Sequence, residues 1–390
     1  MSETRLRAVV AGAGIGGLTA AVALHRRGWR VTVCERAPGP TAVGAAIVLA
    51  PNALRALGSI GFDITRSAGS AAPAALGLRR PDGRWLKRAD TAAMTARYGS
   101  PPLAVHRADL AEALAGALPE GAVRYAAEVT DVSDADQAVV VRTASGELAA
   151  DLVIAADGIR SPLRGRYFPA HPGLRHTGQT AWRAVLPADG PAPAEAAETW
   201  GRGERFGVVP LADGRVYVYA TAVVPDGCRS ADPADPADLR AELLRRFGAW
   251  HDPIPALLGR LDPAAVLRHD LHDLAAPLPR YHRGRLVWLG DAAHAMTPDL
   301  GQGGCQAIED AVVLAGLLGD AGAAAVPAAL AAYTEARWAR TDTLRIRSRR
   351  AGRIGALTHP LAVAARDLAV RATPARAARR AMDDLFGRAT

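Results

Sequence analysis

A glycine-rich stretch near the N-terminus, Gly12-Ala-Gly14-Ile-Gly16-Gly17, has the spacing of a turn that binds phosphate groups. Gly12 permits a tight turn after a strand, Gly14 lets the backbone approach a pyrophosphate, and Gly17 lets the next helix pack close to the sheet. The positive end of that helix then faces the phosphates. Glu35 follows at the offset of about 20 residues where an acidic residue accepts ribose hydroxyls. The pattern predicts a dinucleotide site without separating FAD from NAD.

Two later stretches carry groups that could contact the same ligand. One is Asp157-Gly158-Ile-Arg160-Ser161-Pro-Leu-Arg164. The other runs from Gly290-Asp291 through Pro298 to the cluster Gly301-Gln302-Gly303-Gly304. A helix that starts at this cluster offers free backbone amides and the positive end of its dipole. Such a helix start favours negative charge on a bound ring.

Together and in this order, the three stretches resemble the FAD-binding apparatus of the aromatic-ring hydroxylases. These are the single-component (class A) flavoprotein monooxygenases with the para-hydroxybenzoate hydroxylase fold. The resemblance covers almost the whole chain and is densest over 6–58, 105–165 and 284–316. It implies a non-covalently held FAD and NAD(P)H as a transient co-substrate.

The resemblance also implies roles for individual residues. The carboxylate of Asp291 would bind the ribitol hydroxyls, and Pro298 would lie against the ring where oxygen reacts. Asp157 would support both FAD and NAD(P)H, whereas Arg160 and Arg164 either share that task or are solvated surface. The other residues expected to contact the cofactor are Gly16, Arg36, Gly44, Val48, Arg107, Val129, Gln302 and Cys305.

Candidate substrate residues come from a predicted hairpin in the middle of the chain. The segments 205–210 and 214–217 resemble the substrate-facing hairpin of the urate hydroxylase branch, which uses an Arg and a Tyr at these places. The resemblance predicts that Arg205 orients an anionic or phenolic substrate and that Tyr217 orients or relays its proton. A turn at Asp213-Gly214 would place both side chains on one face, toward the flavin. In the alternative interpretation, Tyr217 packs the strand and Arg205 is a surface residue.

These features predict an FAD-dependent, NAD(P)H-consuming monooxygenase. It would insert one oxygen of O₂ into an electron-rich aromatic or heteroaromatic substrate, through the C4a-hydroperoxyflavin that the resemblance implies. One alternative is a urate- or purine-type hydroxylase or an epoxidase of the same family, although Ala181 and Arg183 replace the asparagines that flank a tryptophan in the urate branch. The alternative of a different class is a non-oxygenating flavin reductase or a flavin-binding partner protein.

The composition disfavours other classes of protein. The net charge of +8 suggests nucleic-acid binding, but Lys87 is the only lysine, and the scattered arginines occur without a nucleic-acid motif. Cys34, Cys228 and Cys305 have no metal-ligand spacing, and no apolar run is long enough to span a membrane. We expect a cytoplasmic monomer or homodimer without a metal.

The elements that must position these residues follow from hydrophobic patterns. Residues 6–11, 18–27 and 30–34 predict a strand, a helix and a strand of the doubly wound kind. From 178 to 272 the pattern changes to strands, which predicts an inserted β-sheet. The stretch 67–102 looks irregular, with short strands near Leu76 and Trp85.

We therefore predict an α/β fold of three parts. A doubly wound, GR2-type FAD-binding domain would comprise 1–70, 101–168 and 280–325. An inserted β-sheet substrate domain would comprise 71–100 and 169–279. C-terminal helices would occupy 326–390.

Overall fold

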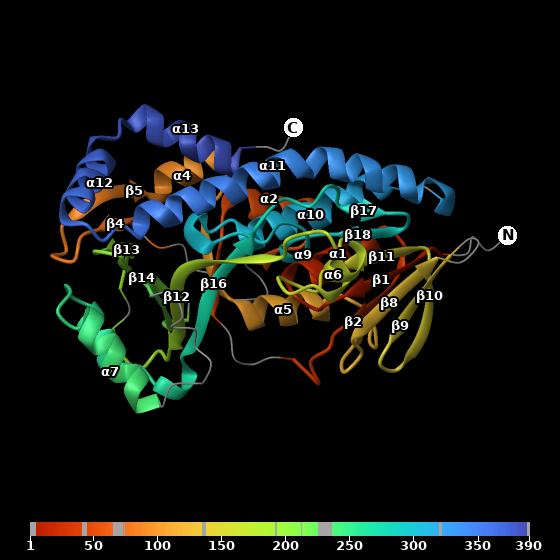
Figure 1. The fold of residues 1–390 in the computed structure, drawn as a ribbon, viewed down its shortest axis with the longest axis horizontal. Helices are drawn as coiled ribbons and strands as arrows, with labels where there is room; N and C mark the ends of the chain where they lie inside the picture. The colour runs from red at the N-terminus through yellow and green to blue at the C-terminus, as the bar shows by residue number, and fades with distance from the viewer. Residues whose placement is uncertain are drawn as a thin grey trace.

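Two large sheets, each with its own helices, and a set of C-terminal helices dominate the part of the chain that the structure describes (Figure 1). The computed structural model describes residues 5–40, 45–64, 73, 75–134, 138–191, 193–211, 213–224, 236–319 and 322–387. Gly44 lies outside these residues, so its predicted contact with the cofactor stays a prediction.

The first sheet carries the glycine turn. Its six strands have the order β17-β18-β11-β1-β2-β7, and all neighbours are parallel except β17 and β18. Parallel strands covered on both faces are rich in apolar residues, which explains why the strands predicted at 6–11 and 30–34 could be recognised. The strands are β1 (Arg7–Ala11), β2 (Arg30–Cys34), β7 (Val123–Arg124), β11 (Leu152–Ala155), β17 (His282–Arg283) and β18 (Leu286–Trp288).

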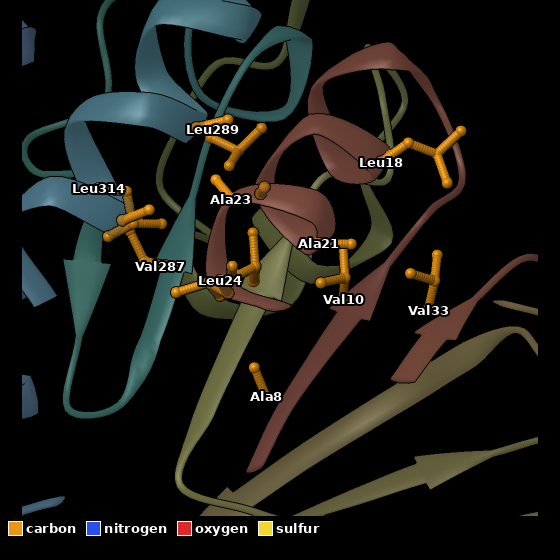
Figure 2. Packing of buried hydrophobic residues seen from close by; sticks show 14 of the residues in the cluster. Ala8, Val10, Leu18, Ala21, Ala23, Leu24, Val33, Val287, Leu289 and Leu314 are labelled. Atoms are coloured by element: carbon orange, nitrogen blue, oxygen red, sulfur yellow. The ribbon is translucent and has the colours of Figure 1, made fainter. Parts of the chain in front are cut away.

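Three helices pack beside this sheet: α1 (Ile15–His25), α5 (Arg107–Gly116) and α10 (Gly303–Leu318), with α1 against both others. Figure 2 shows Val10 and Val33 on the strands near Leu18 of α1, in a buried cluster that Leu314 of α10 joins. Burying each such side chain contributes about 1.5–3 kcal/mol. The core therefore holds α1 and α10 close together, so that both helix N-termini lie at the same edge of the sheet.

Smaller elements surround this core. An antiparallel meander is formed by β8 (Val129–Asp134), β9 (Val139–Thr143) and β10 (Gly146–Ala150). β3 (Ala46–Leu49) pairs with β6 (Leu103–His106), and α2 (Pro51–Ser59) follows β3. The loops after β11 and β18 hold α6 (Pro162–Tyr167), α9 (Asp291–His294) and the 3₁₀ helix η2 (Pro298–Leu300).

The second sheet has seven strands in the order β16-β12-β15-β14-β13-β4-β5. On one face α7 (Pro236–Phe247) and α8 (Ile254–Arg260) bury Trp182, Phe206 and Val218, with the 3₁₀ helix η1 (Pro263–Ala265) beside them. The opposite face packs against β3 and β6, where Ala46 and Ala104 join Val209 and Tyr217 in one apolar cluster. The strands are β4 (Ala75–Arg79), β5 (Trp85–Asp90), β12 (Leu174–Leu186), β13 (Ala196–Trp200), β14 (Glu204–Pro210), β15 (Val216–Val223) and β16 (Leu267–Leu274).

The C-terminal helices connect the two sheets. A 3₁₀ turn, η3 (Ala323–Ala325), leads into α11 (Val326–Gly355), which runs past both sheets in Figure 1 and is followed by α12 (Pro360–Ala372) and α13 (Ala375–Phe386). α13 lies beside α4 (Thr91–Tyr98), where Arg97 pairs with Asp383 at 2.6 Å. No helix in the described part of the chain is long and apolar enough to cross a membrane.

The structure differs from the sequence-based expectation in two segments. The stretch 67–102 was expected to be irregular apart from short strands near Leu76 and Trp85. β4 and β5 confirm these strands, whereas the helix α4 was not expected. Asp90 caps α4 by accepting the Ala92 N–H at 2.8 Å, and Gly99 ends it with φ +85°. A helix of only 8 residues is easily missed even when both ends carry capping residues. α1 begins at Ile15 rather than at the predicted Leu18. Two glycines occupy its first turn, and because glycine is a poor helix former the sequence did not indicate that this turn is helical.

Candidate functional site

The glycine turn between β1 and α1 leaves no room for side chains on its sheet side. Gly12 has φ +105°, and a Cβ there would lie 2.5 Å from a carbonyl oxygen of the loop after β11. A Cβ on Gly17 would overlap the Gly12 carbonyl oxygen, and one on Gly16 would lie 3.0 Å from Ala307 of α10. Gly14 faces open space at the start of α1, whose first turn has no side-chain cap. The free N–H groups there suit an anion.

Glu35, at the end of β2, braces this turn. One carboxylate oxygen accepts the Ala13 N–H at 2.8 Å, and the other accepts the Ala37 N–H at 2.9 Å. Each oxygen can accept a further hydrogen bond, so the carboxylate could also hold ribose hydroxyls. Arg36 is exposed beside it.

Asp157 follows β11 and contacts the same edge of the sheet. One oxygen accepts the Leu163 N–H at 3.3 Å, while Oδ1 is buried without a hydrogen-bond partner in the described chain. Burial raises the pKa of Asp157, and the bonds with Ser161 and Leu163 offset this only in part. A buried oxygen without a partner is an acceptor for a ligand hydroxyl or N–H group.

Arg164 and Arg160 differ, although both belong to the same stretch. Arg164 is 5% exposed and donates to the Ala292 carbonyl at 3.0 Å, so it ties the second stretch to the third. Arg160 is exposed. The surface interpretation therefore fits Arg160 alone.

Asp291 and the start of α10 form the other side of the site. Asp291 is exposed, and its Oδ1 lies 3.9 Å from where a Gly303 Cβ would be. α10 begins at Gly303 without a side-chain cap, and a Cβ on Gly304 would lie 2.5 Å from Ile47. Pro298 is exposed at the start of η2, and Gly301 ends it with φ +62°. A carboxylate and free helix amides thus lie side by side.

Two predicted contact residues turn their side chains into the protein. Cys305 is fully buried, where its Sγ accepts the Ala50 N–H at 3.5 Å and lies 3.7 Å from the Val48 carbonyl. Burial raises the pKa of this thiol to about 12. Gln302 is 1% exposed and accepts from Asn52 at 3.1 Å. Only the backbones of Gln302 and Cys305 can therefore face a cofactor. Val48, another predicted contact, is half-buried in β3.

A buried polar network beneath the Gly290 turn was not anticipated from the sequence. Asp310 of α10 accepts from Gly290 N–H at 2.9 Å, His294 at 2.5 Å and Arg337 at 2.6 Å. Arg337 also pairs with Glu309 at 2.8 Å. Burial raises the pKa of Asp310, but the charges of His294 and Arg337 outweigh it and hold the pKa well below its ordinary value. The network fixes the turn that presents Asp291.

The remaining predicted contacts lie further out. Arg107 is exposed at the first position of α5, and its backbone N–H donates to the Ala45 carbonyl at 3.2 Å. Val129 is buried at the start of β8, paired with Thr143. Their contacts with the cofactor stay predictions.

The described residues fit FAD. Two uncapped helix starts suit the phosphates and the ring, Glu35 and Asp291 offer carboxylates to the hydroxyl groups, and Asp157 keeps an unused buried oxygen. No cluster of three metal-ligating side chains occurs among the residues that the structure describes.

Replacing Asp291 with alanine should weaken FAD binding about 10- to 100-fold, because a hydrogen bond to a charged group contributes about 1.5–3 kcal/mol. The carboxylate is exposed, so the melting temperature of the apoprotein should not change. Titration of apoprotein with FAD, followed by flavin fluorescence, measures the effect. Asp291→Asn should lose less affinity, and equal affinity in all three proteins would contradict the assignment.

Arg205 and Tyr217 lie on the face of the second sheet that turns away from α7 and α8. Arg205 stands opposite Thr221 across β14 and β15, and Tyr217 stands opposite Val209. Tyr217 and Thr221 are four positions apart on one strand, so both point to the same side. The side chains therefore share one face, as the predicted hairpin implied.

Arg205 is compensated within the chain. It is 4% exposed and pairs with Asp299 of η2 at 2.6 Å and with Glu198 at 3.4 Å, while its Nε donates to Thr221 at 3.1 Å. Burial lowers the pKa of Arg205, but the two carboxylates outweigh it and raise the pKa above its ordinary value. These contacts join the second sheet to the Pro298 segment. They also leave the surface interpretation of Arg205 without support.

Tyr217 is buried in an apolar cluster with Ala46, Ala104 and Val209. Its hydroxyl makes no hydrogen bond in the described structure, whereas Tyr219, 5.6 Å away between ring centres, donates to Glu198 at 2.7 Å. Burial raises the pKa of Tyr217, and the charges of Arg183 and Arg107 oppose it. The sequence identifies Arg183 only as a departure from the urate branch, whereas the structure places its charge close enough to Tyr217 to affect the pKa of the phenol.

Comparisons with known proteins agree with this arrangement. The profile of a family described as FAD binding domain matches residues 5–347. Aurachin C monooxygenase/isomerase of Stigmatella aurantiaca is 39% identical over 90% of each chain. An FAD-dependent urate hydroxylase of Klebsiella pneumoniae is 35% identical over 88% of this chain and 89% of its own. The crystal structure of Klebsiella pneumoniae HpxO complexed with FAD and uric acid superposes with a TM-score of 0.88, at 32% identity, over 98% of this chain and 96% of that one.

Proposed function

The chain belongs to the FAD-binding domain family, and we propose that it is an FAD-dependent monooxygenase acting on an electron-rich aromatic or heteroaromatic small molecule. One turnover would convert substrate, NAD(P)H, a proton and O₂ into hydroxylated substrate, NAD(P)⁺ and water. The chemistry that FAD supplies when bound is the activation of O₂ for this insertion.

One observation carries the proposal: the uncapped N-termini of α1 and α10 lie side by side, with a carboxylate next to each. Gly16 and Ala307 bring the two helices together, Glu35 braces the start of α1, and Asp291 lies beside Gly303 of α10. The N-terminal amides of α1 would bind the pyrophosphate, and those of α10 would stabilise negative charge on the ring. Asp157, Pro298 and the other predicted contacts complete the cofactor site.

The substrate would lie between the Pro298 segment and the second sheet. Arg205 would position this segment through Asp299, and Tyr217 would orient or relay the proton of the substrate. The sheet and α11 would keep water out, because the contacts of α11 with η2 close that side. These roles are inferred from the placement of the side chains on one face.

The test is a screen of aromatic and heteroaromatic compounds for substrate-stimulated oxidation of NADH and NADPH, with mass analysis of the product. We expect a yellow protein with one FAD per chain, released by acid, and a product that has gained one oxygen atom. Protein that takes up no FAD would contradict the cofactor, and stimulated oxidation without an oxygenated product would contradict the monooxygenase.

Uric acid belongs in the screen because the solved relative binds it. Ala181 and Arg183, in place of the asparagines of the urate branch, favour another substrate. For the assembly we propose a monomer or homodimer that works in the cytoplasm without nucleic acid. Cys34 and Cys305 are buried free thiols, which supports a reducing compartment such as the cytoplasm.

A further inference from the structure

Arg183 of β12 points toward the proposed substrate space. Its neighbours Trp182 and Ala184 are buried in the core under α7 and α8, so Arg183 between them must face the other way. It stands opposite Tyr219 in β15, and Tyr217 stands opposite the next inward residue, Val185. Arg183 is therefore on the same face as both tyrosines, at the distance of a direct or diagonal cross-strand neighbour.

His269 of β16 belongs to the same group. It stands opposite Ala181, which shares the face of Arg183. His269 is exposed. Desolvation by the surrounding protein and the positive charges of Arg183 and Arg160 lower its pKa, which favours the neutral ring that can donate or accept a hydrogen bond. Its side chain makes no hydrogen bond within the described chain.

Arg183 lacks the counter-charge that Arg175 and Arg205 have. Arg175, on the same strand, pairs with Asp273 at 3.0 Å, and Arg205 pairs with Asp299 and Glu198. Arg183 is half-buried, and within the described residues its side chain has no ion pair or hydrogen bond. A half-buried cation without an anion favours a ligand that supplies one.

We propose that Arg183 binds an anionic group of the substrate, a carboxylate or an ionised ring oxygen, with Tyr217 and His269 as hydrogen-bonding neighbours. This inference rests on the proposed function and names its substrate class: an acidic aromatic or heteroaromatic compound. It also separates two roles that the sequence assigned to one residue. Arg205 positions the Pro298 segment, and Arg183 reads the charge of the substrate.

The test compares acids with their amides on the holoenzyme. The probes are 4-hydroxybenzoate and 4-hydroxybenzamide, salicylate and salicylamide, and 4-hydroxyquinoline-2-carboxylate and its amide. Dissociation constants come from changes in the absorption of the bound flavin. In at least one pair, the wild type should bind the acid about 10- to 100-fold more tightly than the amide, as expected for a charge-assisted bond.

Arg183→Gln should weaken binding of that acid to the level of the amide and leave amide affinity and FAD content unchanged. Arg183→Lys should keep part of the preference. Arg268→Gln is the matched control, because Arg268 lies on the neighbouring strand but over the Trp182 ring at 5.7 Å, on the opposite face. Arg268→Gln should bind the acid and the amide with the same affinities as the wild type.

Three results would overturn the inference. The wild type could bind no acid or show no preference for one, Arg183→Gln could keep the preference, or Arg183→Gln could raise only the KM for NADPH. The last result would mean that the anion is a phosphate of the nucleotide. An oxygenated product from neutral aromatics without acid preference would leave the proposed monooxygenase intact while this inference fails.

Discussion

Replacing Gly17 with alanine should abolish FAD binding and destabilise the protein by more than about 3 kcal/mol, the upper end for overpacking of a core. A Cβ at this position would overlap the Gly12 carbonyl oxygen and press against Val10 and Ala156. Backbone atoms rather than a flexible side chain would have to move, so the glycine turn itself would deform. The melting temperature of the apoprotein and a titration with FAD measure the two effects.

Two other glycines separate the causes. Gly58→Ala, in α2 with nothing within 4 Å of the new Cβ, should be neutral or stabilise by up to about 1 kcal/mol. Gly14→Ala faces open space and should leave the apoprotein stable, but its methyl group would lie where the phosphates are expected, so FAD retention should fall. Equal stability of the Gly17 and Gly58 variants would contradict the close approach of α1 to the turn.

Replacing Arg337 with methionine should destabilise the protein by about 3–5 kcal/mol, the cost of breaking a buried ion pair. Glu309 would lose its main counter-charge, and Asp310 would keep only His294, while the two carboxylate side chains are 8% and 0% exposed. Because Asp310 also accepts the Gly290 N–H, FAD affinity should fall as well. Thermal unfolding of the apoprotein and FAD titration provide the measurements.

Arg340→Met is the matched control for this prediction. Arg340 pairs with the same Glu309 at 3.2 Å, but it is 22% exposed, and its loss should cost less than about 1 kcal/mol. If the two variants lose equal stability, burial of the Arg337 pair is not the cause.

The pH dependence of the same network has a definite sign. The pKa of Asp310 is lowered in the folded protein, so its stabilisation is fully present above about pH 4, the ordinary range for Asp, and is lost as the pH falls through the lower folded value. The gap between wild type and Arg337→Met should therefore narrow as the pH drops below about 4.

The residues proposed to bind FAD, which form the cofactor half of the site, could be identified from the sequence. The roles of Gly12, Gly17 and Glu35 depend on a strand, a turn and a helix within one short segment, where spacing along the chain determines spacing in the fold. Asp291 and the glycine cluster follow the same logic at the start of α10. For Gln302 and Cys305 the sequence indicated the start of α10 but not the direction of the side chains, which depends on what packs behind the helix.

The residues proposed to bind the substrate, which form the substrate half of the site, could be identified from the sequence only in part. β12 is covered on both faces, by α7 and α8 on one side and the cofactor half on the other, so its sequence lacks the alternation that would assign Arg183 to a face. The pairing of Arg205 with Asp299 joins residues far apart in the chain. No local sequence pattern indicates the face on which Arg183 lies or the pairing of Arg205 with Asp299.

By itself, the sequence determined the family, the cofactor and the position of the glycine turn, because backbone conformation and helix starts are local properties that depend on glycine and acidic residues. Only the tertiary structure decided which charges are compensated: Arg205 and Arg337 meet buried carboxylates from other elements, whereas Arg183 does not. The physical reason is that the energy of a charge depends on its burial and its neighbours, and the packing of distant segments sets both.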